Sequence, residues 1–201
     1  MPKKAQKSKT PQKPPVRWGY VFNVLTDDRP GIVAAVSSAI NRLGGNIDAC
    51  SQTVLDGYFT LIMTISLTQN WEPNELGSAI LTEEGLDDCQ ITVRRIAALL
   101  NPPKTNEPDA FVITAFGRDR TGIVSAFSRY LADREVNIID LFGDRTGDDE
   151  FLLISKVEVD ERHDIRNLQF DLEEIGRELG FTVKLQHNNI FVATNQLRLE
   201  R

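Results

Sequence analysis

The chain has 201 residues, of which 41% are hydrophobic and 26% charged, a balance that predicts one large or two small globular domains. Its net charge of −6 is uneven, because six of its 23 basic residues and none of its 29 acidic residues lie in residues 1–17. The acidic remainder repels nucleic-acid phosphate, so we expect no direct nucleic-acid binding by the folded domains.

The 2 cysteines, Cys50 and Cys89, are too few for a disulfide framework and fit a reducing compartment. The sequence shows neither an apolar stretch of membrane-spanning length nor the apolar core of a signal peptide. We therefore expect a cytoplasmic protein without membrane association.

Residues 1–17 are rich in Lys, Pro and Gln, which predicts a disordered basic tail. A first domain is expected over residues 18–99 because alternating and helical patterns follow in a regular order. Its predicted elements are strand 18–25, helix 32–43, strand 46–55, strand 58–67, helix 73–84 and strand 90–96.

Three prolines in residues 100–109 predict a stiff linker, and the same order of elements then recurs in a second domain, residues 110–187. Its predicted elements are strand 111–116, helix 123–131, strand 137–142, strand 151–159, helix 165–179 and strand 181–185. Residues 188–201 form a C-terminal extension. Its residues 188–197 fit a short helix that docks through Ile190, Phe191 and Leu197.

One motif occurs in both halves. Asp28-Arg29-Pro30-Gly31-Ile32-Val33 recurs as Asp119-Arg120-Thr121-Gly122-Ile123-Val124, and Asn46-Ile47 recurs as Asn137-Ile138. Each copy follows a predicted strand and opens a predicted helix. The Asp suits capping, Pro30 suits the first helical turn, and the Gly allows close approach to the backbone. Unpaired amides and the helix dipole would favour an anion there, although plain helix capping with a packing glycine explains the same residues.

Other residue groups carry weaker indications. Asp144, Asp148, Asp149 and Glu150 crowd a predicted hairpin, where acidic residues are common, and they lack the spacing of a calcium loop. His163 and His187 lie in different elements, and no nucleophile elbow, Walker loop or dinucleotide-binding glycine pattern is present. We therefore expect no catalytic residues, no metal and no cofactor.

Two βαββαβ units that carry these motifs resemble ACT domains, which are small amino-acid-sensing regulatory modules with a ferredoxin-like fold. The expected fold class is therefore α+β, with two ferredoxin-like units in tandem and antiparallel sheets that have helices on one face. The tandem arrangement is similar to the glycine cleavage system transcriptional repressor family. Thr121 departs from the more usual proline, which puts the equivalence of the two sites in doubt.

The resemblance implies a ligand site between neighbouring modules, enclosed by the strand-to-helix turn of one and the start of the second strand of the other. The candidate ligand-binding residues are Asp28, Pro30, Gly31, Asn46, Ile47, Asp119, Gly122, Asn137 and Ile138. Helix-terminal amides would hold the carboxylate of an amino acid, and Asp28 or Asp119 would pair with its ammonium group.

The expected function is a non-catalytic regulatory protein that binds a small amino acid and acts through an unidentified protein partner, with glycine cleavage or other amino-acid metabolism as the regulated process. One alternative is a ligand-free protein-interaction module. Another is an enzyme, because similar units precede the catalytic domains of formyltetrahydrofolate deformylase and of a serine-pathway phosphatase. A third is a direct DNA-binding repressor, for which the basic tail is the one supporting feature.

Edge strands and mixed outer sheet faces, with Tyr58, Ile62, Leu152 and Ile154, predict that the two units pair side by side and that the chain forms a homodimer. We also expect Gly31→Val to abolish ligand binding at the first site while the fold remains largely intact.

Overall fold

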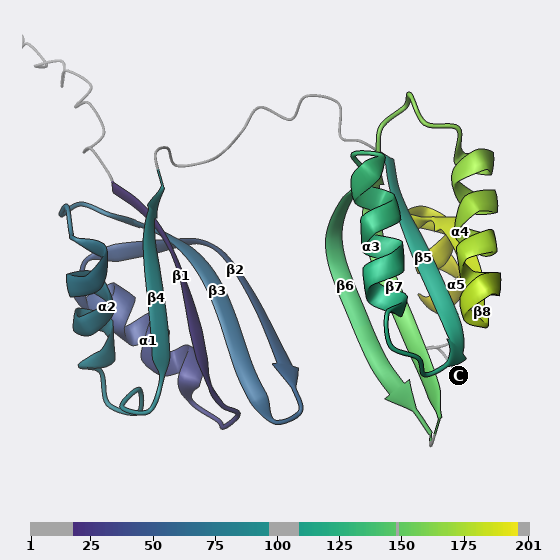
Figure 1. Ribbon diagram of the computed structural model, residues 1–201. Helices are drawn as coiled ribbons and strands as arrows, with labels where there is room; N and C mark the ends of the chain where they lie inside the picture. The colour runs from purple at the N-terminus through teal and green to yellow at the C-terminus, as the bar shows by residue number, and fades with distance from the viewer. Residues whose placement is uncertain (1–17, 97–108, 148, 197–201) are drawn as a thin grey trace, which may run out of the picture. The chain divides into compact units, whose positions relative to one another are not determined.

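The computed structural model describes residues 18–96, 109–147 and 149–196. The predicted basic tail, nearly all of the predicted linker and the last five residues of the C-terminal extension lie outside the described residues. The chain divides between residues 102 and 103 into two compact units, each with its own sheet and core (Figure 1).

The first unit has the predicted order of elements. These are β1 (Trp18–Asp27), α1 (Ile32–Arg42), β2 (Gly45–Leu55), β3 (Tyr58–Leu67), α2 (Pro73–Leu81) and β4 (Gln90–Ile96). The strands form an antiparallel sheet in the order β2-β3-β1-β4. The predicted helix to Glu84 is too long, because the chain leaves α2 after Leu81 through a turn in which Gly85 has φ +85°.

The second unit repeats this plan. Its elements are β5 (Asp109–Arg118), α3 (Ile123–Asp133), β6 (Asn137–Thr146), β7 (Glu150–Val159), α4 (Ile165–Leu179) and β8 (Phe181–His187). The antiparallel sheet has the order β6-β7-β5-β8, which corresponds strand for strand to the first unit. The predicted α+β fold with two ferredoxin-like βαββαβ units is therefore confirmed.

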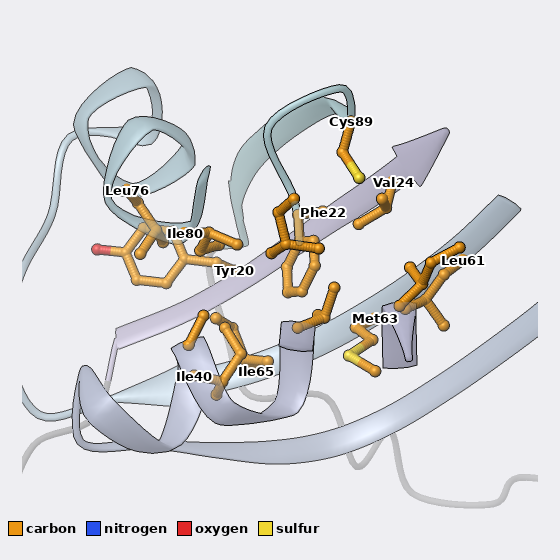
Figure 2. Packing of buried hydrophobic residues seen from close by; sticks show 14 of the residues in the cluster. Tyr20, Phe22, Val24, Ile40, Leu61, Met63, Ile65, Leu76, Ile80 and Cys89 are labelled. Carbon is orange, nitrogen blue, oxygen red and sulfur yellow. The ribbon is translucent and has the colours of Figure 1, made fainter. Parts of the chain in front are cut away.

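The core of the first unit lies between the sheet and its two helices. Tyr20, Phe22 and Val24 alternate along β1 toward the helices and are at most 1% exposed (Figure 2). They pack with Met63 and Ile65 of β3, as the two-residue period of the strands predicts. Val36 and Ile40 of α1 and Leu76 and Ile80 of α2 close the core from the other side.

The second unit has the same arrangement of core residues, and one further helix, α5 (Asn188–Gln196), follows β8. This helix packs against β5 and β8. The prediction that Ile190 docks it is wrong, because Ile190 is 55% exposed. Val112 is buried although it belongs to no core cluster, and strand alternation directs it away from Phe111 and Ile113.

The outer strand of each sheet is exposed along nearly its whole length. In β2 every residue after Gly45 is exposed, and β6 differs only at Ile138 and Thr146. Each strand has one register shift near its start, between Ile47 and Ala49 and between Ile138 and Asp140. Such bulges are frequent at sheet edges, and they leave most of each strand able to pair further.

Candidate functional site

Both copies of the repeated motif form the same turn. Gly31 (φ +100°) and Gly122 (φ +99°) lie in the left-handed region and are the N-cap residues of α1 and α3. Glycine adopts this backbone conformation without the steric cost that a Cβ brings. The Ala35 amide donates to Gly31 O and the Ala126 amide to Gly122 O, both at 2.9 Å, so each helix begins directly at its glycine.

The predicted capping roles of Asp28 and Pro30 are wrong. Neither helix has a side-chain cap, and Pro30 precedes the N-cap glycine instead of occupying the first helical turn. The backbone amide of Asp28 instead donates to Gly57 O, and that of Asp119 to Asp149 O, both at 2.7 Å. These bonds tie each turn to the tip of the neighbouring hairpin.

The first-turn amides of α1 and α3 therefore differ from those of α4. In α4, Asp164 Oδ1 accepts hydrogen bonds from the amides of Arg166 and Asn167 at 2.8 and 3.4 Å. The helices α1 and α3 have no such cap and no acidic residue in their first turns. Unpaired amides at the positive end of a helix dipole suit a carboxylate or another anion.

The arginine of the first turn is held by an ion pair and further hydrogen bonds. Arg29 Nη1 donates to Asp88 Oδ2 at 2.9 Å and to Thr26 Oγ1 at 3.1 Å, and Arg29 Nη2 donates to Gly85 O at 2.9 Å. The hydrogen bond from the Arg29 guanidinium lowers the pKa of the Asp88 carboxyl below its usual value. This ion pair neutralises the cation beside the first turn.

The arginine of the second turn lacks that partner. In the second sheet Thr182 pairs with Phe116, and in the first sheet Gln90 pairs with Leu25, so Thr182 and Gln90 are equivalent positions. Two residues before them, Gly180 occupies the position of Asp88. A Cβ at Gly180 would lie 4.0 Å from Arg120 Cζ, which places the Arg120 guanidinium beside the missing carboxylate. Among the residues that the structure describes, none gives Arg120 an ion pair.

A pocket of about 430 Å³ covers the second turn. Its wall includes Arg120, Gly122 and Ser125 from the turn and the start of α3, and Arg145 and Phe151 from the hairpin. Asp119 also lines the pocket, and its Oδ2 lies 2.8 Å from Arg145 Nε. The second turn therefore brings together unpaired amides, a cation without a carboxylate partner and an acid, which are the groups that recognise a zwitterion.

Asn46 and Asn137 lie at the opposite ends of their units from these turns. Asn46 pairs with Ser66 near one end of β3, whereas Asp27, next to Asp28, pairs with Tyr58 at the other end. The intervening helix α1 has 11 residues. At ~1.5 Å per residue, α1 separates the two groups by roughly 16 Å. One unit by itself does not bring the nine predicted site residues together.

The side chains of these asparagines stabilise the starts of β2 and β6. Asn46 Nδ2 donates to Asp48 Oδ1 at 2.8 Å, and Asn137 Nδ2 donates to Glu158 Oε2 at 3.0 Å. Ile47 is 36% exposed, whereas Ile138 packs against the core of its unit. Sequence reasoning missed Arg120, Gly180 and Arg145, although aligning the two halves of the chain through β4 and β8 would have revealed the exchange of Asp88 for Gly180.

The remaining predicted groups are dispersed. Asp149 pairs with Arg118 at 2.7 Å, and Asp148 lies outside the described residues. Within the described part of the chain, no group of three or more His, Cys, Asp or Glu side chains is placed to hold a metal ion. None of the helices in that part is long and apolar enough to cross a membrane.

The fold and the paired glycine turns define a tandem of ferredoxin-like modules. The family model described as ACT domain matches the chain twice, over residues 20–91 and 109–186. The chain therefore belongs to the ACT domain family, which confirms the resemblance predicted from the sequence.

The chain is also similar in sequence to one group of relatives and in fold to solved structures. A UPF0237 protein of Methanocaldococcus jannaschii is 38% identical over 81 residues, which cover 40% of this chain and 89% of the relative. An unknown protein from Galdieria sulphuraria has the same fold, with 24% identity, a TM-score of 0.69 and coverage of 86% and 99% of the two chains. A proposed glycine cleavage system transcriptional repressor has 20% identity, a TM-score of 0.64 and coverage of 85% and 97%.

Proposed function

We propose that this protein is a non-catalytic regulator that binds a small amino acid at its glycine turns and acts through a partner protein. The observation that carries the proposal is the pocket over the second turn, where Arg120 and the uncapped amides of α3 lie beside Asp119. Membership of the ACT domain family supports a regulatory role.

The chemistry of the pocket fits an amino acid better than a simple anion. The amides at the start of α3 and the Arg120 guanidinium would hold the α-carboxylate through charge-assisted hydrogen bonds. The Asp119 carboxylate would pair with the α-ammonium group, in competition with Arg145. As in related ACT domains, the start of β2 or β6 in a neighbouring module, with Asn46-Ile47 or Asn137-Ile138, would close the site.

Calorimetric titration of the full chain with the twenty amino acids and related metabolites tests this proposal. We expect saturable binding of at least one small amino acid, and we expect Arg120→Ala to weaken it about tenfold or more through the lost charged hydrogen bond. Arg129→Ala is the matched control, because Arg129 is an exposed residue of α3 that does not line the pocket. Absence of binding by any of these compounds would refute the sensor function.

A ligand-free protein-interaction module is the second candidate, and the first unit favours it. In that unit Asp88 already forms an ion pair with Arg29, which leaves the arginine less available to a ligand. The outer strand β2 is also exposed along its length after Gly45. Such a module would bind its partner equally well with and without amino acids. Isolation of partners from cell extract in the presence and absence of the amino acids separates the two candidates.

The likeness to a proposed glycine cleavage repressor leads us to propose amino-acid metabolism, glycine cleavage included, as the regulated process in the cytoplasm. Direct repression at DNA is less compatible with the acidic folded part. A gel-shift comparison of the full chain with residues 18–201 tests this point. Sequence-specific DNA binding by the truncated form would contradict the proposal of a protein partner.

A further inference from the structure

The second unit contains a pocket of about 490 Å³ at the other end of α3 from the Gly122 turn. We call it the helix-end pocket. Its wall consists of Tyr130, Arg134, Arg162, His163, Asp164, Asn167, Leu168 and Asp171. These residues come from the last turn of α3 and its C-cap, the loop before α4, and the first turns of α4. The pocket shares no residue with the one over the Gly122 turn.

The first unit fills the same place with apolar side chains. Trp71 lies directly before the N-cap of α2, and His163 lies directly before the N-cap of α4, so the two residues are equivalent. In the same way, Leu43 is the C-cap of α1 and Arg134 is the C-cap of α3. Trp71 and Leu43 both pack against the core of the first unit.

Two further positions change in the same sense. Ala39 corresponds to Tyr130 and Ala79 to Asp171 when the helices are aligned on their caps, and Ala39 is fully buried. Four apolar side chains of one unit are thus replaced by Tyr, Arg, His and Asp in the other. An ordinary solvent-facing surface does not require such a coordinated change, because the core beneath it is apolar in both units.

The two carboxylates of the pocket already have partners. Asp171 Oδ2 accepts hydrogen bonds from Tyr130 Oη and from Arg134 Nη2, both at 2.9 Å. Asp164 Oδ1 accepts from the first amides of α4. The Arg134 guanidinium also lies 3.8 Å from the centre of the Tyr130 ring, which holds it in the wall.

The hydrogen-bonding groups of the pocket that are still unpaired are mainly N–H donors. An arginine carries five N–H groups, and Arg134 uses one of them on Asp171. Arg162 contributes a second guanidinium, of which Nη2 donates to Glu135 at 2.7 Å and Nε lies 3.9 Å from Asp160 Oδ1. The Nε2 atom of His163 is buried and has no hydrogen-bond partner within the described residues. A ligand that presents acceptor oxygens would pair with the remaining N–H groups of these two guanidinium groups.

We propose that the helix-end pocket is a second ligand site, which binds a small metabolite through an oxyanion, either a carboxylate or a phosphate group. The volume is within the range of about 300–1,000 Å³ that small-molecule sites occupy. Arg134, held by Tyr130 and Asp171, recognises the oxyanion, and His163 provides the space that Trp71 fills in the first unit. The proposal does not depend on amino-acid binding at the glycine turns.

The test is a nuclear magnetic resonance titration of the isotopically labelled full chain, with inorganic phosphate in one arm and acetate in the other. We expect saturable shifts of backbone amide signals in residues 162–168 with at least one of the two anions. A response to phosphate alone or to acetate alone identifies which oxyanion the pocket recognises.

Three variants localise the binding. Arg134→Leu, which introduces the residue of the first unit, should weaken the anion about tenfold or more. His163→Trp, which fills the pocket as in the first unit, should abolish the shifts. Arg129→Leu removes the same charge from α3 outside the pocket and should leave affinity within about twofold, since its charge is exposed and screened. Thermal unfolding checks that each variant is folded, and Arg134→Gln, which removes the charge but keeps an N–H donor for Asp171, replaces Arg134→Leu if the latter is not.

Two results would overturn the proposal. One is the absence of saturable shifts in residues 162–168 with both anions. The other is unchanged affinity in folded Arg134 and His163 variants, because the anion would then bind elsewhere.

Discussion

Single glycine positions decide how a ligand could approach each turn. A Cβ at Gly31 would meet no described atom within 4 Å, so the position is not packed. A larger side chain at Gly31 would therefore not clash with neighbouring atoms. The backbone conformation at φ +100° is what disfavours other residues at this position. A β-branched residue is strongly disfavoured there, whereas asparagine tolerates the left-handed region.

We therefore predict that Gly31→Val lowers the free energy of unfolding by about 1–3 kcal/mol and that Gly31→Asn lowers it less. Urea denaturation of both variants measures the difference. Ligand binding at the first site should also be lost in Gly31→Val, because the side chain extends into the space over the α1 amides. Equal stability of the two variants would show that backbone strain does not govern this turn.

The exchange of Asp88 for Gly180 between the two units leads to a second prediction about a single residue. In Gly180→Asp, the new carboxylate should pair with Arg120 and weaken amino-acid binding at the second turn about tenfold or more. Gly180→Asn is the matched control, since Asn adopts the same φ of +77° and carries no charge. Calorimetric titration of both variants with the amino acid that binds the natural chain gives the answer. Similar affinities of the two variants would exclude Arg120 from ligand recognition.

Tyr130 makes a prediction about pH. Burial raises the pKa of Tyr130 to about 12, and its hydrogen bond to Asp171 acts in the same direction. Because the folded-state pKa exceeds the unfolded value of 10.0, the stabilisation is complete below pH 10 and is lost as the pH rises toward 12. Ultraviolet titrations of the natural chain and of Tyr130→Phe should differ by one phenol that ionises near pH 12. Identical titration curves of the two chains above pH 10 would contradict the prediction.

At the scale of elements, sequence patterns predicted the type and order of the elements in both units. The strong two-residue alternation in β3 and the helical stripes in α1 and α4 made this possible. Strand ends were less accurate: β1 continues to Asp27 and β6 to Thr146, because backbone pairing with β3 and β7 extends them beyond their apolar residues. Register and edge exposure depend on tertiary contacts that no local pattern contains.

The candidate site could be predicted only in part. The glycine turns follow from local sequence, because a left-handed N-cap is a property of the residue itself. The roles of Asp28 and Pro30 could not be read in this way, since the hydrogen bond from the Asp28 amide to Gly57 O joins segments that are distant in sequence. Arg145 and Gly180 reach the second turn through the sheet, so their part in the site depends on the register of the strands.

The spacing between α4 and β8 depends on Gly176. A Cβ there would lie 2.3 Å from Val183 Cγ2 and 3.0 Å from Phe181 O. We predict that Gly176→Ala destabilises the second unit by about 1–3 kcal/mol, although alanine is intrinsically the better helix former by ~1 kcal/mol. Glu178→Ala in the same helix is the control and should have little effect, because Glu178 is exposed. Chemical denaturation measures both, and a stabilised Gly176→Ala variant would show that α4 moves away freely.

At the scale of the whole molecule, the two units share one fold but differ in the polar groups that a ligand can reach. In the first unit Asp88 neutralises Arg29, and Trp71 fills the place that corresponds to the helix-end pocket. The second unit leaves Arg120 without a carboxylate partner within the described residues and carries the helix-end pocket. Duplication thus kept the core pattern, while the ligand-accessible groups are concentrated in the second half.

Exposed apolar residues on the sheets support the predicted homodimer. Tyr58 and Ile62 of β3 are 57% and 51% exposed, and Phe142 of β6 is 49% exposed. We predict that light scattering gives twice the mass of the chain and that Ile62→Glu or Phe142→Glu lowers it toward a monomer. Phe170→Glu is the control, because Phe170 is 61% exposed on α4, away from the sheet. A monomeric natural chain would contradict the prediction.

The hydrogen bond from the Asp119 amide to Asp149 O has a consequence for signalling. It ties the turn that faces the pocket to the β6–β7 hairpin, whose outer strand β6 is also one edge of the sheet. Arg145 of that strand lines the same pocket. An occupant of the pocket and a molecule that pairs with β6 would therefore both act on the hairpin. Thermodynamic linkage then requires reciprocity, so that each changes the affinity of the other by the same factor.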